Sequence, residues 1–319
     1  MKTLLPSLFF AAFGFAVAPV AQAKIERTVV KTFNVQPGGS LQVGTSAGSI
    51  VVEVAPGNTV QVTAREHIRA DSDAEADEAL KPLTLTLEQS GSNVTAKAEY
   101  EKTGLGFHFG SWPPVVVDFV VQVPAKYSAQ LKTSGGSITV GDLGGTLEAG
   151  TSGGDLRLGQ IAGKVDARTS GGSVWLAGAG AGVLLSTSGG NITVGRVAGA
   201  AELRTSGGDI KATGVVGSLE AHTSGGDVTA TFAGPLTGDN VLSTSGGRVR
   251  AYVPTGASFE LDASTSGGRV RADGLTLTIA HGGVNRSSLR GIVGAGGPTL
   301  RLRSSGGDVS VETAKVAAN

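Results

Sequence analysis

The sequence predicts an all-β protein, built as a right-handed parallel β-solenoid with rungs of about 18 to 21 residues. Three observations lead to this fold class. An eight-letter motif that begins Thr-Ser-Gly-Gly recurs along the chain, apolar and polar residues alternate within each copy, and glycine supplies 51 of 319 residues. That glycine content is about twice the usual share of roughly 7%. A fixed period of this length is typical of architectures in which repeats stack on one another.

The repeated motif sets the expected spacing of the rungs. Its copies begin at Thr133, Thr151, Thr169, Thr187, Thr205, Thr223, Thr244, Thr265 and Ser304. These starting numbers rise first by 18, then twice by 21, and finally by 39, which is long enough for two rungs. We therefore expect consecutive copies on neighbouring rungs. A degenerate copy that lacks the Thr-Ser-Gly-Gly motif is expected around 282–296.

Each copy alternates apolar and polar residues with a period of two. Ile138 and Val140 are apolar, for example, and Thr139 between them is polar. This period is typical of a strand with one buried face, and the Gly-Gly pairs leave too few residues between them for an ordinary helix. Each unit is therefore predicted to contain two short strands and two glycine turns. Stacking would pair each strand with its copy one rung away, about 4.8 Å distant, in a right-handed coil.

The Thr-Ser-Gly-Gly segment is interpreted as a corner of the solenoid. Glycine is suited to a corner because it tolerates positive φ. The threonine column, from Thr133 to Thr265, is expected to point inward and to form a ladder of hydroxyls between rungs. A phosphate-binding loop is disfavoured, since no helix follows the glycines and no lysine stands as in G-x-x-x-x-G-K-[ST]. The G-G-x-G-x-D spacing of a calcium-binding roll is also missing.

Segment 1–23 has the form of a signal peptide. Lys2 is followed by an apolar run, and Ala21-Gln22-Ala23 has the A-x-A form of a cleavage site. We expect cleavage after Ala23 and export to the periplasm, the cell surface or the medium. The absence of cysteine means that the exported chain holds its fold without disulfides. The expected division is 1–23 signal peptide, 24–124 N-terminal β region, 125–314 repeat solenoid and 315–319 C-terminal tail.

The N-terminal region is predicted to form strands in a looser version of the same pattern, within 41–54, 58–66, 83–89, 93–100 and 115–124. The first of these is an early copy of the motif in which Ala47 replaces the first glycine. One capping helix is expected around 72–81. Ser72 and Glu75 make a capping box there, and Pro82 ends the helix. Such an insertion suits a cap over one end of the rod, where a bare edge would invite aggregation.

Four stretches of the chain share the character of one known family. They are the T-S-G-G-[SDN]-[IVL]-x-[VLA] repeats, the acidic helix DSDAEADEALKPL, the segment VDFVVQVPAKYSAQLKTSGG that leads into the first repeat, and the C-terminal segment GAGGPTLRLRSSGGDVSV. With these features the chain resembles the bacterial putative-adhesin domain family, the glycine-rich, toast-rack-like β-repeat proteins of the cell envelope. The resemblance covers nearly all of the expected mature chain. It implies an envelope protein and supplies no catalytic residue.

The function expected from these features is that of an exported, non-enzymatic adhesin or cell-envelope scaffold. No catalytic, cofactor-binding or metal-binding residue is assigned, and no cofactor is expected, because the four histidines are scattered without metal-ligand spacing. Asp209 and Asp227, on adjacent rungs, are interpreted as turn residues that hydrogen-bond their own backbone. The alternatives are a carbohydrate-active β-helix enzyme, either a lyase or a hydrolase, and a self-assembling fibre subunit.

The charged residues are expected to form columns along the outside of the rod. An acidic column (Glu148, Asp166, Glu202 and Glu220) should run beside a column that holds Arg168, Ser186, Arg204 and His222. Opposite charges in neighbouring columns predict a solvated, salt-bridged face. Between 248 and 303, eight arginines stand against three acids, so this end of the rod should be basic.

Two outward features are candidate contact sites. Trp175 can stack on a sugar or a partner protein from an exposed strand, or lie over Arg157 one rung away. Four arginines are expected to stack in two pairs on neighbouring strands as an anion contact, and these are Arg248, Arg250, Arg269 and Arg271. Envelope glycans, anionic lipids or another envelope protein are the expected partners. A net charge of zero gives no reason to expect nucleic acid, and no later segment has the apolar length of a membrane span.

Overall fold

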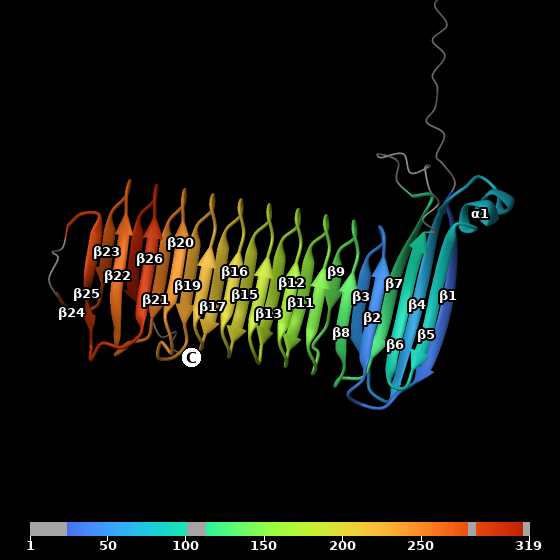
Figure 1. The fold of residues 1–319 in the computed structure, drawn as a ribbon, viewed down its shortest axis with the longest axis horizontal. Coiled ribbons are helices and arrows are strands. Elements are labelled where there is room, and N and C mark those ends of the chain that lie inside the picture. The colour runs from blue at the N-terminus through green and yellow to red at the C-terminus, as the bar shows by residue number, and fades with distance from the viewer. Residues whose placement is uncertain (1–23, 101–112, 280–284, 315–319) are drawn as a thin grey trace, which may run out of the picture.

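The computed structural model describes residues 24–100, 113–279 and 285–314, in which two long β-sheets lie face to face as an elongated rod (Figure 1). Sheet A has 13 strands and sheet B has 14, and within the described residues one short helix, α1 (Asp73–Leu80), lies at the N-terminal end. The mostly-β, largely parallel architecture expected from the repeats is confirmed. The expected signal peptide and C-terminal tail lie outside the described residues.

The strands of the two sheets alternate along the repeat part of the chain. In spatial order, sheet A contains β1 (Lys24–Asn34), β4 (Thr59–Arg69), β7 (Val115–Val123), β3 (Ile50–Val54), β9 (Ile138–Val140), β11 (Leu156–Ile161), β13 (Val174–Ala179), β15 (Ile192–Val197), β17 (Ile210–Val215), β19 (Val228–Phe232), β21 (Val249–Val253), β27 (Val309–Thr313) and β23 (Val270–Asp273). Sheet B contains β24 (Leu277–Thr278), β25 (Ser288–Val293), β22 (Phe259–Thr265), β26 (Thr299–Ser304), β20 (Asn240–Thr244), β18 (Leu219–His222), β16 (Ala201–Arg204), β14 (Val183–Ser186), β12 (Val165–Arg168), β10 (Leu147–Gly150), β8 (Ser128–Lys132), β2 (Ser40–Thr45), β6 (Asn93–Tyr100) and β5 (Leu83–Ser90).

The core lies between the sheets and consists of the inward residues of each strand. In β11, Leu156 and Leu158 are fully buried, whereas Arg157 between them is exposed. The same alternation recurs in β9, β10 and β13. Each buried leucine stabilises the fold by about 1.5–3 kcal/mol relative to an exposed one. The alternation leaves every second side chain facing solvent, where it is available for binding.

Parallel pairing joins equivalent positions of successive copies. Leu147 on β10 faces Val165 on β12, and Val165 in turn faces Val183 on β14, so the residue number rises by 18 at each step. Between β18 and β20 the rise becomes 21, with Glu220 facing Val241. From β8 to β21, therefore, the offset between paired residues follows the spacing of the motif, as expected.

The threonine of each corner is buried and bonds the neighbouring copy. Thr151 Oγ1 donates to the carbonyl oxygen of Gly136, 2.8 Å away, and accepts from the N–H of Gly154 at 3.3 Å. The same pair of bonds recurs from Thr133 through Thr265. The inward direction is confirmed, but the expected ladder of hydroxyls is wrong. Each hydroxyl bonds a glycine carbonyl of the neighbouring copy, because that carbonyl has a buried lone pair to satisfy.

The two glycines of each corner have different roles, and neither is the expected one. Positive φ occurs at ten described glycines, none of which belongs to a Thr-Ser-Gly-Gly corner. At the second glycine the constraint is space, because a Cβ on Gly172 would lie 2.0 Å from the carbonyl oxygen of Gly154. At the first glycine a Cβ on Gly171 would lie 3.4 Å from its nearest neighbour. This tolerance explains how Ala47 can replace the first glycine in the early copy.

The residue after each Gly-Gly pair extends the bonding between copies. Ser137 Oγ accepts from the backbone N–H of Asp155 at 3.1 Å, and Asp155 Oδ1 accepts from that of Ser173 at 2.9 Å. Asp209 Oδ1 accepts in the same way from the N–H of Asp227, 2.7 Å away. Asp209 and Asp227 therefore accept hydrogen bonds from backbone N–H groups, but the expectation that they bond their own backbone is wrong, because these N–H groups belong to the next copy. Serine, aspartate and asparagine share this position because each carries an acceptor oxygen.

The final strands do not follow the order of the chain. β27 pairs with both β21 and β23, and β26 pairs with both β20 and β22, so the copy at Ser304 lies between those at Thr244 and Thr265. The expectation that Thr244 and Thr265 begin neighbouring rungs is wrong. Segment 288–293 is not a degenerate copy of the motif, because it forms β25, which runs antiparallel to β22. The chain reverses through β24 and β25, and its last copy fills the space between two earlier ones (Figure 1).

The N-terminal end is closed by long antiparallel strands and by α1. β4 pairs with β1 and β7, and β5 pairs with β6. The helix begins where expected, with Ser72 Oγ accepting from the N–H of Glu75 at 3.3 Å, but the Glu75 carboxylate accepts from Asp71 rather than from Ser72. Strand β1 was not among the expected strands, because several of its residues are exposed and its alternation is weak.

The different roles of the two corner glycines can be tested with a matched pair of variants. We expect Gly172→Ala to destabilise the rod by about 1–3 kcal/mol or more, because the new methyl group overlaps a backbone carbonyl that cannot move alone. Gly171→Ala should change the stability by no more than about 0.5 kcal/mol. Chemical denaturation of both variants measures the difference, and equal losses would contradict the assignment.

Candidate functional site

Sheet B presents the expected columns of opposite charge on its outer face. Glu148 faces Asp166, and Glu202 faces Glu220, on neighbouring strands. Within or between strands, the acids pair with the adjacent column through Lys132–Glu148 at 3.0 Å, Arg168–Asp166 at 3.1 Å, and Arg204 with both Glu202 and Glu220 at 2.7 Å. The expected salt-bridged face is therefore confirmed. All of these side chains are exposed or half-buried, so each pair contributes little to stability.

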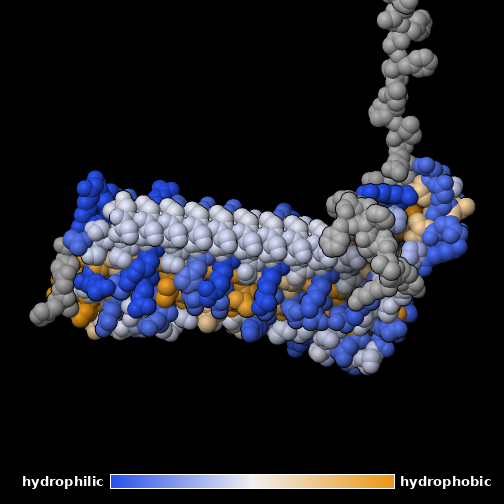
Figure 2. Space-filling model, turned by 45° about the horizontal axis from the view of Figure 1, so that its top comes forward, coloured by the Kyte–Doolittle hydropathy of each residue, from blue (hydrophilic) through white to orange (hydrophobic). Residues whose placement is uncertain are grey.

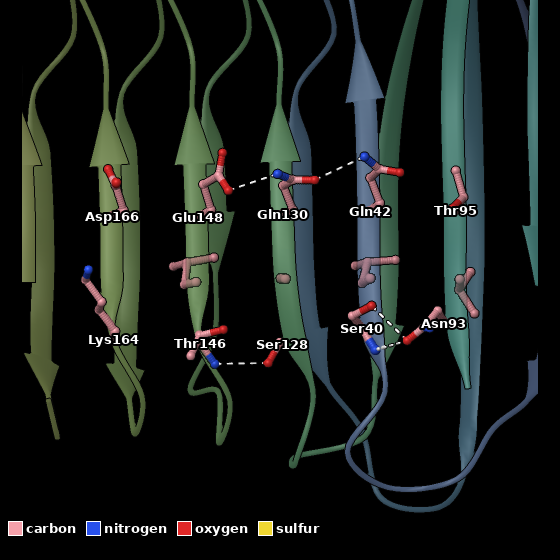
Figure 3. Close-up of a pocket in the computed structure, with 14 residues that line it drawn as sticks. Ser40, Gln42, Asn93, Thr95, Ser128, Gln130, Thr146, Glu148, Lys164 and Asp166 are labelled. Carbon is pink, nitrogen blue, oxygen red and sulfur yellow. Dashed lines mark hydrogen bonds between the residues drawn. The ribbon is translucent and has the colours of Figure 1, made fainter. Parts of the chain in front are cut away.

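A shallow groove crosses the same face between β6 and β12 (Figure 3). It encloses about 530 Å³ and lies across β6, β2, β8, β10 and β12. Polar side chains of two rows border it, one row containing Gln42, Gln130 and Glu148 and the other containing Ser40 and Ser128. The groove was not predicted, because the residue types at these outward positions differ from one strand to the next. The available signal was the run of hydrogen-bonding residues at equivalent outward positions.

Hydrogen bonds fix the upper row of the groove. Gln42 Nε2 donates to Gln130 Oε1 at 3.0 Å, and Gln130 Nε2 donates to Glu148 Oε2 at 2.9 Å (Figure 3). In the lower row, the N–H of Thr146 donates to Ser128 Oγ at 3.2 Å. The side chains therefore stand on paired strands in set orientations, and a ligand would lose little side-chain entropy on binding them.

The groove continues along the rod. A second hollow of about 490 Å³ shares Lys164 with the first and lies beside Leu184, Glu202 and Glu220. Figure 2 shows hydrophilic side chains interspersed with hydrophobic surface along this face, next to the pale edge where the small corner residues lie. A surface of this form can hydrogen-bond an extended polar ligand at several successive strands.

Two carboxylates of this face, those of Glu148 and Glu220, are held in their ionised form. The hydrogen bonds from Gln130 and then Lys132 lower the pKa of Glu148 below its ordinary value of 4.5. The hydrogen bond with His222, assisted by the charge of Arg204, lowers the pKa of Glu220. The groove therefore presents acceptor oxygens and negative charge at neutral pH.

One chain of hydrogen bonds on this face has the residue types of a hydrolytic triad. His222 Nδ1 lies 2.5 Å from Ser243 Oγ, and His222 Nε2 lies 2.9 Å from Glu220 Oε1. The sequence placed His222 in this column but did not associate it with Ser243, which lies one motif spacing later, on the neighbouring strand. Among the described residues, no group of three or more His, Cys, Asp or Glu side chains has the arrangement of a metal site.

Trp175 is exposed on sheet A, as expected. Its side chain is 48% exposed, and its register partners are Arg157 and Thr193. The alternative in which Arg157 covers the ring is wrong, because Arg157 Nη2 binds Asp155 at 2.9 Å and, in the described part of the chain, no cation–π contact joins Arg157 to Trp175. Trp175 is therefore about half exposed and has no cation–π partner among the described residues. Its role as a stacking contact stays a prediction.

The four arginines expected to stack on one another are not on neighbouring strands. Ser310 of β27 faces both Arg250 and Arg271, and so separates them. Arg248 is instead paired with Asp227, with Nη2 to Oδ2 at 2.9 Å, and the N–H of Arg269 donates to Asp308. The expected stacking of the arginines on neighbouring strands is therefore wrong, because the last copy of the motif inserts between them.

The chain matches one protein family model and is similar to several solved structures of low sequence identity. A family model described as "Toastrack DUF4097" matches residues 47–312. Solved structures include a "putative adhesin" from Bacteroides fragilis NCTC 9343, with 11% identity, a TM-score of 0.34 and coverage of 90% of this chain and 97% of that one. A "putative lipid binding protein" from Parabacteroides distasonis ATCC 8503 has 14% identity and a TM-score of 0.44, with the same coverage. No curated protein matches the chain. Within the described residues, no helix is long and apolar enough to cross a membrane.

The role of Glu148 in the charged columns leads to a pH-dependent prediction. Because its pKa is lowered in the fold, its contribution to stability is present above the ordinary value of 4.5 and is lost as the pH falls through the folded value. Glu148→Gln should therefore lower the stability at neutral pH by about 0.2–1 kcal/mol and by progressively less at acidic pH. Thermal melting across this pH range measures the effect.

The matched control is Glu88→Gln, which removes the same charge from an exposed carboxylate that makes no ion pair among the described residues. Its effect on melting should be small and should change little with pH. A loss in Glu148→Gln that persists undiminished at acidic pH would contradict the ionic role.

Proposed function

Because the chain belongs to the DUF4097 Toastrack family, we propose that it is an exported, non-enzymatic rod that serves as an adhesin or binding scaffold of the cell envelope. The scaffold proposed for this role is a right-handed parallel β-solenoid with rungs of about 18 to 21 residues, which the strand registers support. The A-x-A segment at Ala21 to Ala23 supports export to the periplasm, the surface or the medium.

The observation that carries the proposal is the groove on the outer face of sheet B. Its bordering side chains stand on paired strands and are oriented by hydrogen bonds, as Gln42, Gln130 and Glu148 are. Contacts repeated over several strands act on one ligand together, so weak individual contacts combine into useful affinity. The ligand class that this surface suits is an extended polar polymer, such as an envelope glycan, or a segment of another envelope protein.

Hydrolysis is the second candidate, favoured by the hydrogen-bonded order of Ser243, His222 and Glu220. It ranks lower for two reasons. Arg204 also binds Glu220, which weakens the basicity that a triad carboxylate supplies to its histidine. The three residues also lie on an open strand face rather than in a cleft that excludes water. A fibre subunit is disfavoured, because α1 and antiparallel strands cover the N-terminal end of the rod, where another copy would have to add its strands.

The binding role can be tested on intact cells and on isolated envelopes. We expect the protein to be recovered outside the cytoplasm with Lys24 as its first residue, and to sediment with envelopes from the cells that produce it. The variant Gln42→Ala/Gln130→Ala should sediment several-fold less, because it removes the hydrogen-bonded row of the groove. Fractionation, intact-mass measurement and co-sedimentation provide the readouts.

The control variant is Gln122→Ala/Gln160→Ala, which removes the same number of glutamines from sheet A without changing the charge. It should bind envelopes as the parent does. Equal binding by the parent and both variants would exclude the groove as the binding surface, and recovery only in the cytoplasm would exclude the envelope role.

A further inference from the structure

Three arginines converge on a single carboxylate near the C-terminal end of the rod. Asp262 of β22 lies between Arg301 of β26 and Arg290 of β25, its register partners on the two sides. Arg290 Nε is 3.0 Å from Asp262 Oδ1, Arg301 Nε is 3.6 Å from Oδ2, and Arg303 Nη2 also binds Oδ2. One carboxylate neutralises the charge of only one of these three arginines. The cluster of Asp262 and its three arginines therefore carries a net positive charge.

The three arginines are not equally occupied. Arg303 already hydrogen-bonds within the fold, because its Nη1 also donates to the carbonyl oxygens of Asp262 at 2.7 Å and of Leu302 at 3.0 Å. Arg290 and Arg301 turn only Nε toward Asp262. Their terminal nitrogens have no hydrogen-bond partner among the described residues, and their side chains are 69% and 51% exposed.

A groove of about 360 Å³ lies over these strands and is lined by both exposed arginines. Glu260 is the other acid at this groove, so three guanidiniums against two carboxylates leave an excess of one positive charge. Burial tends to raise the pKa of Asp262, but hydrogen bonds from Arg303 and Arg290 outweigh it and lower the pKa. Asp262 therefore stays ionised at neutral pH and holds Nε of Arg290 and Arg301.

We propose that Arg290 and Arg301 form a binding site for a phosphate group, with Asp262 and Arg303 as its positioning residues. The two exposed arginines lie on strands that flank β22, so their forks approach the groove from both sides. A tetrahedral phosphate has enough acceptor oxygens to meet two forks at once, and the guanidinium fork matches its geometry. The site is independent of the polar groove between β6 and β12 and stands whether or not the envelope role is correct.

The probes for this site are inorganic phosphate and vesicles of phosphatidylcholine with or without phosphatidic acid, whose headgroup is a phosphate monoester. We expect saturable binding of at least one of the two phosphate forms, and the form that binds identifies the source. Arg290→Gln/Arg301→Gln should weaken it by about tenfold or more, because two charge-assisted contacts are lost. Arg290→Lys/Arg301→Lys, which keeps the charge but not the fork, should lie between this variant and the parent.

The matched control is Arg168→Gln/Arg204→Gln, which removes two exposed arginines from the same sheet face but from pairs with their own acids. It changes the net charge equally and should bind phosphate within about twofold of the parent. Circular dichroism checks that every variant keeps the fold. The proposal is overturned if neither phosphate form binds the parent. It is also overturned if Arg290→Gln/Arg301→Gln and the control variant lose binding to the same extent, since the loss of net charge alone would then explain the result.

Discussion

The whole rod depends on the contact between the second glycine of one corner and the backbone of the next. No Cβ fits at this position, so strands can reach hydrogen-bonding distance there only if every copy supplies a glycine. The buried threonine then bonds the glycine carbonyl, and the residue after the glycines bonds the next backbone N–H. The motif is therefore explained by stacking, and the copies need no common ligand to account for their similarity. The serine of each corner is exposed, and nothing in the structure explains why it recurs.

The sequence was sufficient for those parts of the fold that depend on local pattern. Period-two alternation predicted the strands of the repeats, and the cap residues predicted α1, because burial and capping act over a few neighbouring residues. The order of the last strands could not be predicted in this way. Every corner offers the same groups, and Thr265 accordingly bonds Gly307 of the last copy while Ser304 bonds Gly247. Pattern alone does not say which copies become neighbours.

The candidate sites were harder to predict than the fold for a related reason. Stacking constrains the inward side chains and the corners, whereas outward side chains are free to differ from one strand to the next. Two consequences follow along sheet B, where a hydrogen-bonded polar row near Gln130 gives way to an arginine cluster around Asp262. The excess of arginine between 248 and 303 was visible in the sequence, but assigning it to the correct residues required the position of β26 between β20 and β22.

The central claim is that the corner contacts can join copies that are not consecutive in the chain, and engineered disulfides test it most directly in this cysteine-free chain. Arg250 and Ser310 are register partners, whereas Arg250 and Arg271 lie two strands apart, at about 10 Å. A disulfide needs Cα atoms about 4.4–6.8 Å apart. Arg250→Cys/Ser310→Cys should therefore cross-link on mild oxidation, and Arg250→Cys/Arg271→Cys should not. Cross-linking only of the second pair would contradict the strand order and the claim that rests on it.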